Sequence, residues 1–536
     1  MAAIENRGSR PAIVFIGFMA AGKTRAAAAV AERLGGTLAD TDQMLESTFG
    51  EPIREFFERE GEDAFRREEE TLIGSLLGPG GLDDQLRDRD GDGPLVVALG
   101  GGAIEGEAVR DVLAGHLCVW CRVDPEVAWE RASRSRARPL AGDRDAFIGR
   151  FEAREPLYEE LARAILPSNA REAAGEAAPW LAALRELPQM RIAWAESAGG
   201  SYPAAVGPGA LELLERTREF APDLPARLFC VGDADAVAAQ RALMPACEAV
   251  IEVFGGERSK TIAEAERILA ALAEMGVRRD DGVLAFGGGV VGDLAGFCAA
   301  TYQRGIPVVQ APTTLVAMVD SAYGGKTGVD LPAGKNYVGA YHQPLAVLAD
   351  PRALATLPRV ELAAGFVEVL KTALIAGGRL WGRVRELDSL DPDALADVIF
   401  DCARVKIEVV AADERDSGRR AVLNLGHTVG HAIEAASGYE RYRHGEAVGL
   451  GLLAALRLSD AGELRAEVAD RLAAQGLPTQ LDREVGVDEV IAAVGRDKKA
   501  TREGVGFVLL ERPGEPRWGQ RVDPDRVRAA VQELYG

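Results

Sequence analysis

Three of the five histidines in this 536-residue chain fall within residues 427–444. His427 and His431 are four positions apart, so a helix would place both on one face. His444 follows, with a glutamate two residues later. Imidazoles prefer borderline metals such as zinc, and a carboxylate would complete a catalytic site with an open position. The window predicts a metal centre, and spacing alone selects His427 and His431 as ligands; packed or solvated histidines are the alternative.

A second chemical motif occupies Gly17–Thr24 and fits the pattern GxxxxGK[ST] between a strand-like run, Ala12–Ile16, and a helical stretch. Its glycines would let backbone N–H groups wrap phosphate oxygens at a helix N-terminus. Lys23 adds positive charge and Thr24 can bind magnesium. The motif predicts phosphoryl transfer from ATP with Mg²⁺, held by Gly17, Ala20, Ala21, Gly22, Lys23 and Thr24.

Candidate groups for the phosphoryl acceptor follow the next strand-like runs. Asp40 and Asp42 could serve magnesium and an acceptor hydroxyl respectively, although Asp42 could instead cap a helix. The triple glycine after Leu95–Leu99 leaves room for a ligand against bare backbone. Arginines suit a carboxylate acceptor or the transferring phosphate, although any one alone could be a solvated surface residue. These candidates are Gly100, Gly101, Gly102, Arg66, Arg138 and Arg154.

A third motif lies further along, where the run Leu284–Phe286 enters the glycine-rich turn Gly287–Asp293. A strand that leads into such a turn can seat a pyrophosphate on a helix N-terminus. The turn departs from the standard GxGxxG pattern. Gly255–Lys260 and Gly324–Gly328 add tight turns that carry charged groups.

Composition limits the class of protein. The chain has 62 Lys and Arg against 83 Asp and Glu, a net charge of −21, which argues against binding nucleic acid or an anionic membrane. No apolar run reaches the roughly 18 residues that span a bilayer. Six cysteines are too few for a disulfide framework, and Cys118 and Cys121 fit a buried strand better than a redox or zinc site. We expect a soluble, cytoplasmic protein.

The length suggests roughly three to four domain-sized units. Alternating apolar runs and helical stretches predict an α/β domain with a parallel sheet in three layers over residues 1–175. An Ala- and Glu-rich helical linker would cover 176–189 and a polar, flexible insertion Leu82–Gly93. A second α/β domain would cover 190–350 and an all-helical domain 351–536.

Residues 11–170 resemble shikimate kinase. The matching motifs are Asp40–Asp42, Glu60–Glu69, the triple glycine, Arg138–Leu140 and Arg154–Tyr158. The resemblance implies that Asp42 orients the shikimate hydroxyl, while Arg66, Arg154 and the triple glycine hold the ring and its carboxylate. Glu69 would steady Arg66, Arg138 would lie on a lid over ATP, and Asp40 would act near magnesium. Ala20, Ala21 and Arg25 depart from the family pattern.

Residues from about 190 to the end resemble 3-dehydroquinate synthase. The collinear matches are Gly287–Phe297, Ala299–Gly305, Pro312–Leu315, Gly324–Gly328, Gly334–Asn336 and Leu423–His427. The resemblance implies an α/β NAD-binding domain and a metal, Zn²⁺ or Co²⁺, on Glu368, His427 and His444. His431 then becomes a hydrogen-bonding or acid/base group.

The same resemblance implies two further sets of residues. Glu368 and Lys371 are three apart, so on a helix one can bind metal while the other meets substrate. Catalytic or substrate contacts would come from Arg304, Asp320, Lys326, Asn336, Lys371, Arg420, Asn424 and Lys498. NAD would be held by Glu257, Lys260, Gly288, Gly289, Val290, Asp293, Thr313, Thr314 and Lys335.

Together the resemblances predict a bifunctional enzyme of aromatic-amino-acid precursor synthesis. One unit would phosphorylate shikimate, and the other would convert 3-deoxy-D-arabino-heptulosonate 7-phosphate to 3-dehydroquinate with loss of phosphate. The alternatives are another sugar-phosphate cyclase or a metal-dependent alcohol dehydrogenase at the C-terminus, or a non-catalytic regulatory module at the N-terminus. Its partners would be small anionic substrates and a second copy of the chain, paired through the dehydroquinate-synthase-like unit.

Overall fold

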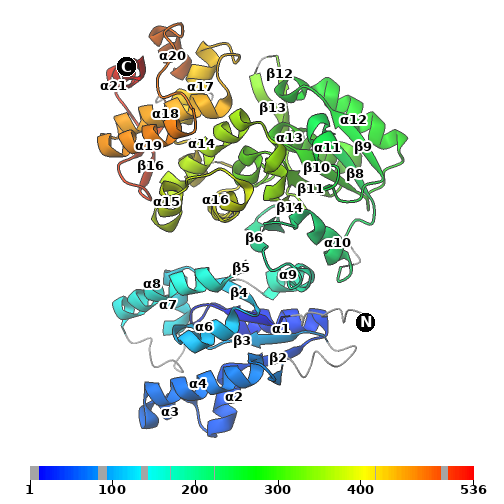
Figure 1. Ribbon diagram of the computed structural model, residues 1–536, viewed down its shortest axis with the longest axis vertical. Coiled ribbons are helices and arrows are strands. Elements are labelled where there is room, and N and C mark those ends of the chain that lie inside the picture. Colours follow the sequence, from blue (N-terminus) through cyan, green and yellow to red (C-terminus); the bar gives the residue numbers. More distant parts are fainter. Residues whose placement is uncertain are drawn as a thin grey trace, which may run out of the picture. The chain divides into compact units, whose positions relative to one another are not determined.

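A computed structural model describes residues 11–82, 93–134, 143–168, 171–221, 224–332, 334–416, 418–495 and 505–535. The chain forms two compact units (Figure 1). Unit 1 comprises Met1–Trp194 and Glu212–Leu224, and unit 2 comprises Ala195–Leu211 and Pro225–Gly536. The predicted insertion Leu82–Gly93 lies almost wholly outside the described residues.

Unit 1 is built on a parallel sheet in the order β2-β3-β1-β4-β5, with β6 (Arg191–Ser197) beside β5. Its central strands β1, β3 and β4 are buried almost throughout, which explains why nearly all of their residues are apolar. The predicted α/β class and strands are confirmed. The strands are β1 (Ile13–Ile16), β2 (Thr37–Asp40), β3 (Leu95–Ala98), β4 (Leu117–Arg122) and β5 (Ala164–Pro167).

Helices connect these parallel strands. Because parallel strands end at the same edge, the residues that follow β1, β2 and β3 lie close together. The helices of unit 1 are α1 (Lys23–Leu34), α2 (Thr41–Phe49), α3 (Ile53–Glu60), α4 (Glu62–Leu77), η1 (Ala103–Glu105), α6 (Glu107–Leu113), α7 (Pro125–Ser133), α8 (Arg144–Leu161), α9 (Arg171–Leu184), η2 (Ala210–Glu212, entering from unit 2) and α10 (Leu213–Arg218).

The predicted linker 176–189 differs from the observed structure. Its first part belongs to α9, which packs against α1. The side chains from Ala177 to Leu184 are all buried. Small alanines allow this close helix packing, so the segment is part of the folded core of unit 1 rather than a spacer.

The first half of unit 2 contains parallel strands in the order β7-β14-β11-β10-β8-β9. Helices α12 and α13 pack with these strands around an apolar core. The elements are β7 (Gly200–Val206), β8 (Leu228–Asp233), α11 (Ala234–Gln240), β9 (Ala249–Val253), η3 (Gly256–Ser259), α12 (Ile262–Glu274), β10 (Gly282–Gly287), α13 (Gly289–Thr301), η4 (Tyr302–Arg304), β11 (Val308–Pro312), η5 (Ala317–Ser321), the hairpin β12 (Lys326–Leu331) and β13 (Gly334–Tyr341), β14 (Ala346–Ala349) and η6 (Pro351–Thr356).

The rest of unit 2 is mainly helical, as predicted, with α14 against α16 and α18, and α17 against α18 (Figure 1). The all-helical prediction needs one correction, because β15 and β16 form an antiparallel pair. The elements are α14 (Arg359–Ala376), α15 (Gly378–Arg385), α16 (Pro392–Ala412), η7 (Arg419–Asn424), α17 (His427–Ala436), α18 (His444–Leu458), α19 (Gly462–Ala474), α20 (Val487–Val494), β15 (Phe507–Leu510), β16 (Pro516–Gln520), α21 (Pro524–Gln532) and η8 (Glu533–Tyr535).

None of the helices in the described ranges combines the length and apolar composition that crossing a bilayer requires.

Candidate active sites

The glycine-rich loop after β1 has the backbone of an anion site. Gly22 (φ 90°) is the N-cap of α1, and within the described residues no side chain caps that helix start. The first N–H groups of α1 therefore remain for a ligand. A Cβ on Gly17 would lie 2.7 Å from the carbonyl oxygen of Cys121, so only glycine fits there. Ala20 takes a left-handed φ of 64°, a conformation that glycine adopts at lower cost.

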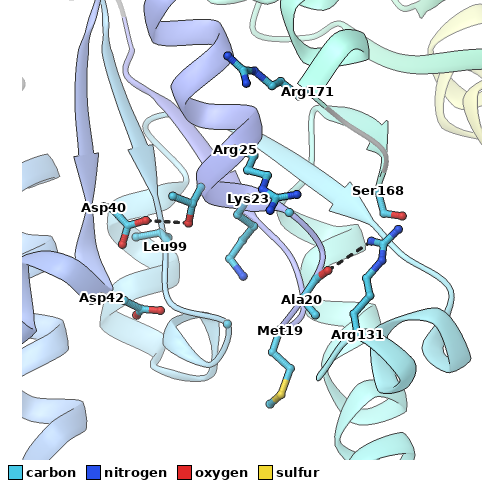
Figure 2. A pocket seen from close by; sticks show the side chains of 13 residues that line it. Met19, Ala20, Lys23, Arg25, Asp40, Asp42, Leu99, Arg131, Ser168 and Arg171 are labelled. Atoms are coloured by element: carbon cyan, nitrogen blue, oxygen red, sulfur yellow. Dashed lines mark hydrogen bonds between the residues drawn. The ribbon is translucent and has the colours of Figure 1, made fainter. Parts of the chain in front are cut away.

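A cavity of about 720 Å³ opens beside this loop (Figure 2). Lys23 Nζ lies over the loop and donates to the carbonyl oxygens of Gly17 and Phe18 at 2.9 and 3.1 Å. Thr24 Oγ1 donates to Asp40 Oδ2 at 2.8 Å. The cavity is lined by Met19, Ala20, Gly22, Lys23, Thr24, Arg25, Asp40, Asp42, Leu99, Gly101, Arg131, Ser168 and Arg171.

The two aspartates after β2 have different local roles. Asp40 caps α2 by accepting from Gln43 N at 3.2 Å, while Asp42 lies in the first turn of that helix. The cap that we considered for Asp42 is therefore provided by Asp40. The Asp42 carboxylate faces the cavity instead.

The acceptor candidates meet around the triple glycine. A Cβ on Gly100 would lie 2.5 Å from Glu69 Oε1 and 2.8 Å from Asp42 Oδ1, and one on Gly102 would lie 2.3 Å from Arg66 Nη2. The glycines thus let these side chains approach bare backbone. Arg66 Nη1 contacts Glu69 Oε2 at 2.6 Å, the pairing expected from the resemblance, and burial raises the pKa of Glu69.

Arg154, on α8, is buried and binds the Glu105 carboxylate through Nε and Nη2 at 2.9 and 2.8 Å. Glu105 Oε2 is also 3.6 Å from Arg66 Nη2. The structure therefore brings Asp42, Arg66, Arg154 and the triple glycine to one site. Arg138 lies outside the described residues.

The metal candidates converge from three helices. Glu368 Oε1 on α14 lies 3.6 Å from His427 Nε2 on α17 and 3.5 Å from His444 Nε2 on α18. Tetrahedral zinc with ligand bonds of about 2.0–2.1 Å separates its ligand atoms by about 3.3 Å. Glu368 is buried, and Oε1 has no hydrogen-bond partner in the described part of the chain. This orphaned buried oxygen fits a metal cation, which would supply the missing partner.

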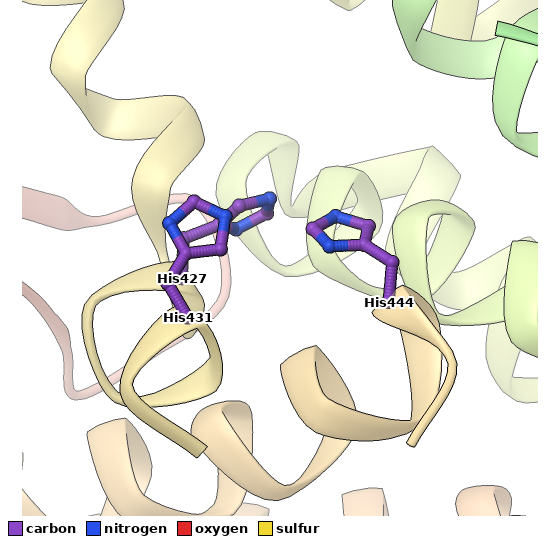
Figure 3. A group of neighbouring side chains, drawn as sticks. All are labelled: His427, His431 and His444. Atoms are coloured by element: carbon purple, nitrogen blue, oxygen red, sulfur yellow. The ribbon is translucent and has the colours of Figure 1, made fainter. Parts of the chain in front are cut away.

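His431 belongs to the same cluster. The ligand atoms of His427, His431 and His444 all lie within 4.8 Å of one another (Figure 3). The His431 ring centre is 5.2 Å from that of His427 and 5.7 Å from that of His444. His431 is exposed, whereas Glu368 is almost wholly buried.

A buried charge network surrounds the candidate metal ligands. Lys371 Nζ lies 2.5 Å from Glu368 Oε2. Burial alone would raise the pKa of Glu368, but Lys371 and two histidines hold it well below its ordinary value. Burial likewise opposes ionisation of Asp320, yet Lys371 and Lys406 lower its pKa to about 2. These carboxyl groups are therefore ionised at neutral pH.

Lys406 is a member of this network that the sequence did not reveal. It is buried on α16 and pairs with Asp320. The available signal was a lysine at an apolar helix position, with Ala403, Ile407 and Val410 as its buried neighbours.

Arg420 is buried and donates to the carbonyl oxygen of Glu414 at 2.6 Å, and Asn424 donates to that of Ala421 at 3.0 Å. Lys326 pairs with Asp416 at 2.7 Å. The side chains of these predicted substrate contacts are thus held by neighbours in the structure.

The third motif forms the turn between β10 and α13. Gly288 is the N-cap of α13, and no side chain caps this helix start among the described residues. A Cβ on Gly289 would lie 2.8 Å from Ser321 Oγ, and one on Gly288 would lie 3.0 Å from Thr314 Cγ2. Lys260 Nζ pairs with Asp293 Oδ2 at 2.5 Å, and Lys335 with Glu257 at 3.1 Å. The free helix start with nearby lysines fits a dinucleotide pyrophosphate.

Other predicted substrate contacts lie on separate elements or outside the described residues. Arg304 lies in η4, which directly follows α13. Asn336 has a left-handed φ of 55° on the exposed hairpin strand β13. Lys498 lies outside the described residues.

Cys118 and Cys121 are buried on β4, as expected, and burial raises the pKa of both thiols to about 12. Protonated, buried thiols are neither good nucleophiles nor good metal ligands. The structural interpretation of this CxxC pair stands.

The fold and the two sites define a two-enzyme chain: a phosphate-loop phosphotransferase and a metal- and dinucleotide-binding enzyme. Family models bear this out. Shikimate kinase matches residues 19–185, the N-terminal part of 3-dehydroquinate synthase matches 250–364, and its C-terminal part matches 365–500.

Individual relatives agree. The 3-dehydroquinate synthase of Symbiobacterium thermophilum is 42% identical over 351 residues, which cover 62% of this chain and 98% of that protein. That of Halorhodospira halophila is 46% identical over 341 residues, covering 61% and 94%. A solved 2-epi-5-epi-valiolone synthase from Streptomyces hygroscopicus is 28% identical with a TM-score of 0.54, covering 59% of this chain and 92% of that one. The chain belongs to the 3-dehydroquinate synthase family and carries a shikimate kinase domain at its N-terminus.

Proposed function

We propose that this chain catalyses two reactions: ATP-dependent phosphorylation of shikimate, and conversion of 3-deoxy-D-arabino-heptulosonate 7-phosphate to 3-dehydroquinate with loss of phosphate. The observation that carries the proposal is that each unit brings its own set of reactive groups together. Unit 1 brings Asp42, Arg66 and Arg154 to a phosphate loop, and unit 2 brings Glu368, His427 and His444 together.

In the kinase unit, Lys23 and the N–H groups at the start of α1 would bind the ATP phosphates. Thr24 and Asp40, which share a hydrogen bond, would hold Mg²⁺. Asp42 would accept the proton of the shikimate hydroxyl, since its carboxylate faces the cavity. Arg66 and Arg154 would hold the substrate carboxylate. Arg138 is proposed to close over ATP.

In the cyclase unit, we propose Glu368, His427 and His444 as ligands of Zn²⁺ or Co²⁺, with His431 as a neighbouring hydrogen-bond or acid/base group. The solved valiolone synthase relative carries NAD⁺ and Zn²⁺, and the ligand spacing here suits such a metal. A bound metal would polarise a substrate oxygen, and bound NAD would take and return a hydride.

The remaining cations would bind the anionic substrate. Lys371 and Lys406 flank Asp320 in the buried network, so the three groups can hold a proton or a substrate oxygen near the metal position. The other proposed contacts are Arg304, Lys326, Asn336, Arg420, Asn424 and Lys498. NAD would lie on Gly288, Gly289 and Val290, with Glu257, Lys260, Asp293, Thr313, Thr314 and Lys335 around it.

We also propose a cytoplasmic homodimer, paired through the cyclase unit, that binds neither nucleic acid nor membrane. The six cysteines are all free, which suits a reducing compartment, and the −21 net charge disfavours polyanions. Residues 190–350 would form the NAD-binding part and 351–536 the metal- and substrate-binding part of the cyclase.

Two substitutions in the full chain test the proposal. Lys23→Ala should abolish shikimate phosphorylation and spare cyclisation, while His444→Ala should do the reverse. Both activities are assayed on each purified variant, with circular dichroism to confirm folding. If either substitution silences both reactions in a folded protein, the two sites are not independent.

A further inference from the structure

Glu105 contacts both arginines that we assign to the substrate carboxylate. Glu105 is the last residue of η1, the short helix that directly follows the triple glycine. Its carboxylate binds Arg154 through two parallel hydrogen bonds of 2.9 and 2.8 Å, and lies 3.6 Å from Arg66 Nη2. A planar two-point contact of this kind is how arginine recognises carboxylates in general. Glu105 thus makes with Arg154 the contact that a bound carboxylic acid would make.

Both arginines are already paired with carboxylates. Arg66 pairs with Glu69 at 2.6 Å and with Glu62 at 3.1 Å, and Arg154 pairs with Glu105. A further carboxylate that entered beside these groups would add an uncompensated negative charge. Binding of an acidic substrate to the arginine pair therefore requires a protein carboxylate to move.

Burial determines which carboxylate can move. The side chain of Glu69 is 3% exposed, whereas that of Glu105 is 44% exposed. Arg154 itself is 5% exposed, and its guanidinium carbon lies over the ring of Phe18, 5.7 Å from the ring centre. The arginine is fixed by its surroundings, and the glutamate can rotate into water without being desolvated elsewhere.

We infer that Glu105 is an affinity-determining residue of the kinase site, which occupies the arginine pair in the free enzyme and is displaced by the carboxylate of the acceptor. This inference rests on the proposed shikimate kinase activity. Displacement costs part of the Glu105–Arg154 interaction, so Glu105 weakens acceptor binding without touching the phosphoryl group. Glu105 should therefore raise KM for the acceptor and leave kcat unchanged.

The test is Glu105→Gln in the full chain, which keeps the shape of the side chain and removes its charge. KM for shikimate should fall about three- to tenfold, because an ion pair whose carboxylate is partly exposed to water is a modest competitor. The value of kcat and KM for ATP should stay unchanged. Calorimetric titration with shikimate in the absence of ATP should show the same gain in affinity. Glu105→Ala should change KM in the same direction.

Glu62→Gln is the matched control. Glu62 also pairs with Arg66, at 3.1 Å, and is 57% exposed. Because it does not lie on Arg154 in the contacts of the described residues, its replacement should leave KM within about twofold.

A rise in KM or a fall in kcat for Glu105→Gln would overturn the inference, because it would show that Glu105 positions the arginines. Unchanged affinity would overturn it as well. Failure of the proposed function has a different signature: wild-type protein would then neither bind nor phosphorylate shikimate.

Discussion

The kinase site and the metal centre balance charge in opposite ways. In the kinase site Arg154 pairs with the half-exposed Glu105, and we infer that the acceptor carboxylate takes the place of Glu105. In the proposed metal centre Glu368 is buried with three imidazoles nearby, and its Oε1 has no hydrogen-bond partner in the described residues. On these proposals the first site exchanges one carboxylate for another, whereas the second takes up a metal cation.

Glycines position the reactive groups in both sites, through different contacts. In the kinase site they leave space for side chains, since a Cβ on Gly102 would meet Arg66. In the metal centre they bring helices together. A Cβ on Gly445 would lie 2.0 Å from the carbonyl oxygen of Ala364, and one on Gly451 would lie 2.0 Å from that of Gly426. Backbone-to-backbone contact between α18 and its neighbours α14 and α17 sets the distances among the ligands.

Removing the buried carboxylate should give the largest effect. Glu368→Ala deletes a proposed ligand and removes the carboxylate that lies 2.5 Å from the buried Lys371, so cyclase activity should fall by at least on the order of a thousandfold. Metal content, measured by atomic emission after dialysis, should fall with it, while shikimate phosphorylation stays at the wild-type level.

Glu361→Gln is the control on the same helix, because Glu361 is half-exposed and pairs with Arg443. It should keep its metal. If Glu368→Ala also retained stoichiometric metal, the three histidines alone would be the ligand set, as their spacing within 4.8 Å permits.

Replacing a residue that contacts a proposed metal ligand should weaken metal binding less than removing the ligand itself. Glu434 Oε2 lies 3.4 Å from His444 Nδ1, the ring nitrogen that faces away from Glu368. Glu434→Gln should weaken metal binding about 10- to 100-fold, because such carboxylates fix the orientation and basicity of the histidine. Competition with a chromogenic chelator measures the affinity. Wild-type affinity in this variant would remove Glu434 from the metal centre.

Adding a methyl group at Gly100 in the kinase site should have an effect of intermediate size, on KM for shikimate. Gly100→Ala places a Cβ 2.5 Å from Glu69 Oε1 and 2.8 Å from Asp42 Oδ1. Both carboxylates must shift, so KM for shikimate should rise about tenfold, the consequence of a small displacement in a positioned site. Gly149→Ala, on α8, is the matched control because nothing lies within 4 Å of its Cβ. Equal kinetics for the two variants would contradict the close packing at Gly100.

Local sequence patterns predicted the elements whose structure is evident from a single segment of the chain. The runs at β1, β3 and β4 are apolar because both sheet faces are covered, and this is visible in the sequence. The alanines of α9 were interpreted as a linker because small side chains give little hydrophobic signal. Their burial depends on how closely α1 can approach. The short strand β15 was also missed, because its apolar run of four residues is too short to tell a strand from a helix segment until it pairs with β16.

The site was predictable where a motif carries the chemistry, as at Gly17–Thr24 and in the histidine window. Charged residues outside motifs were not. Lys406 acquires its role from Asp320, 86 residues earlier, and Glu105 from Arg154, 49 residues later. A single charged side chain is ordinarily solvated, so only the folded chain shows which ones are paired.

The smallest effect expected in this comparison concerns the phosphate loop, where Ala20 and Ala21 stand at positions that are commonly glycine in the family. Ala20 has a left-handed φ of 64°, a conformation that costs a residue with a Cβ about 1 kcal/mol. Ala20→Gly removes this cost, although it also gives the unfolded chain more freedom, so we expect a gain in unfolding free energy of at most about 1 kcal/mol.

Ala21→Gly is the matched control: Ala21 is buried and is not among the residues with positive φ, so its replacement should destabilise the protein. Denaturant unfolding of the full chain, monitored through the shikimate-phosphorylating activity of unit 1, distinguishes the two variants. If Ala20→Gly were as destabilising as Ala21→Gly, the left-handed backbone at Ala20 would not be a source of strain in the loop.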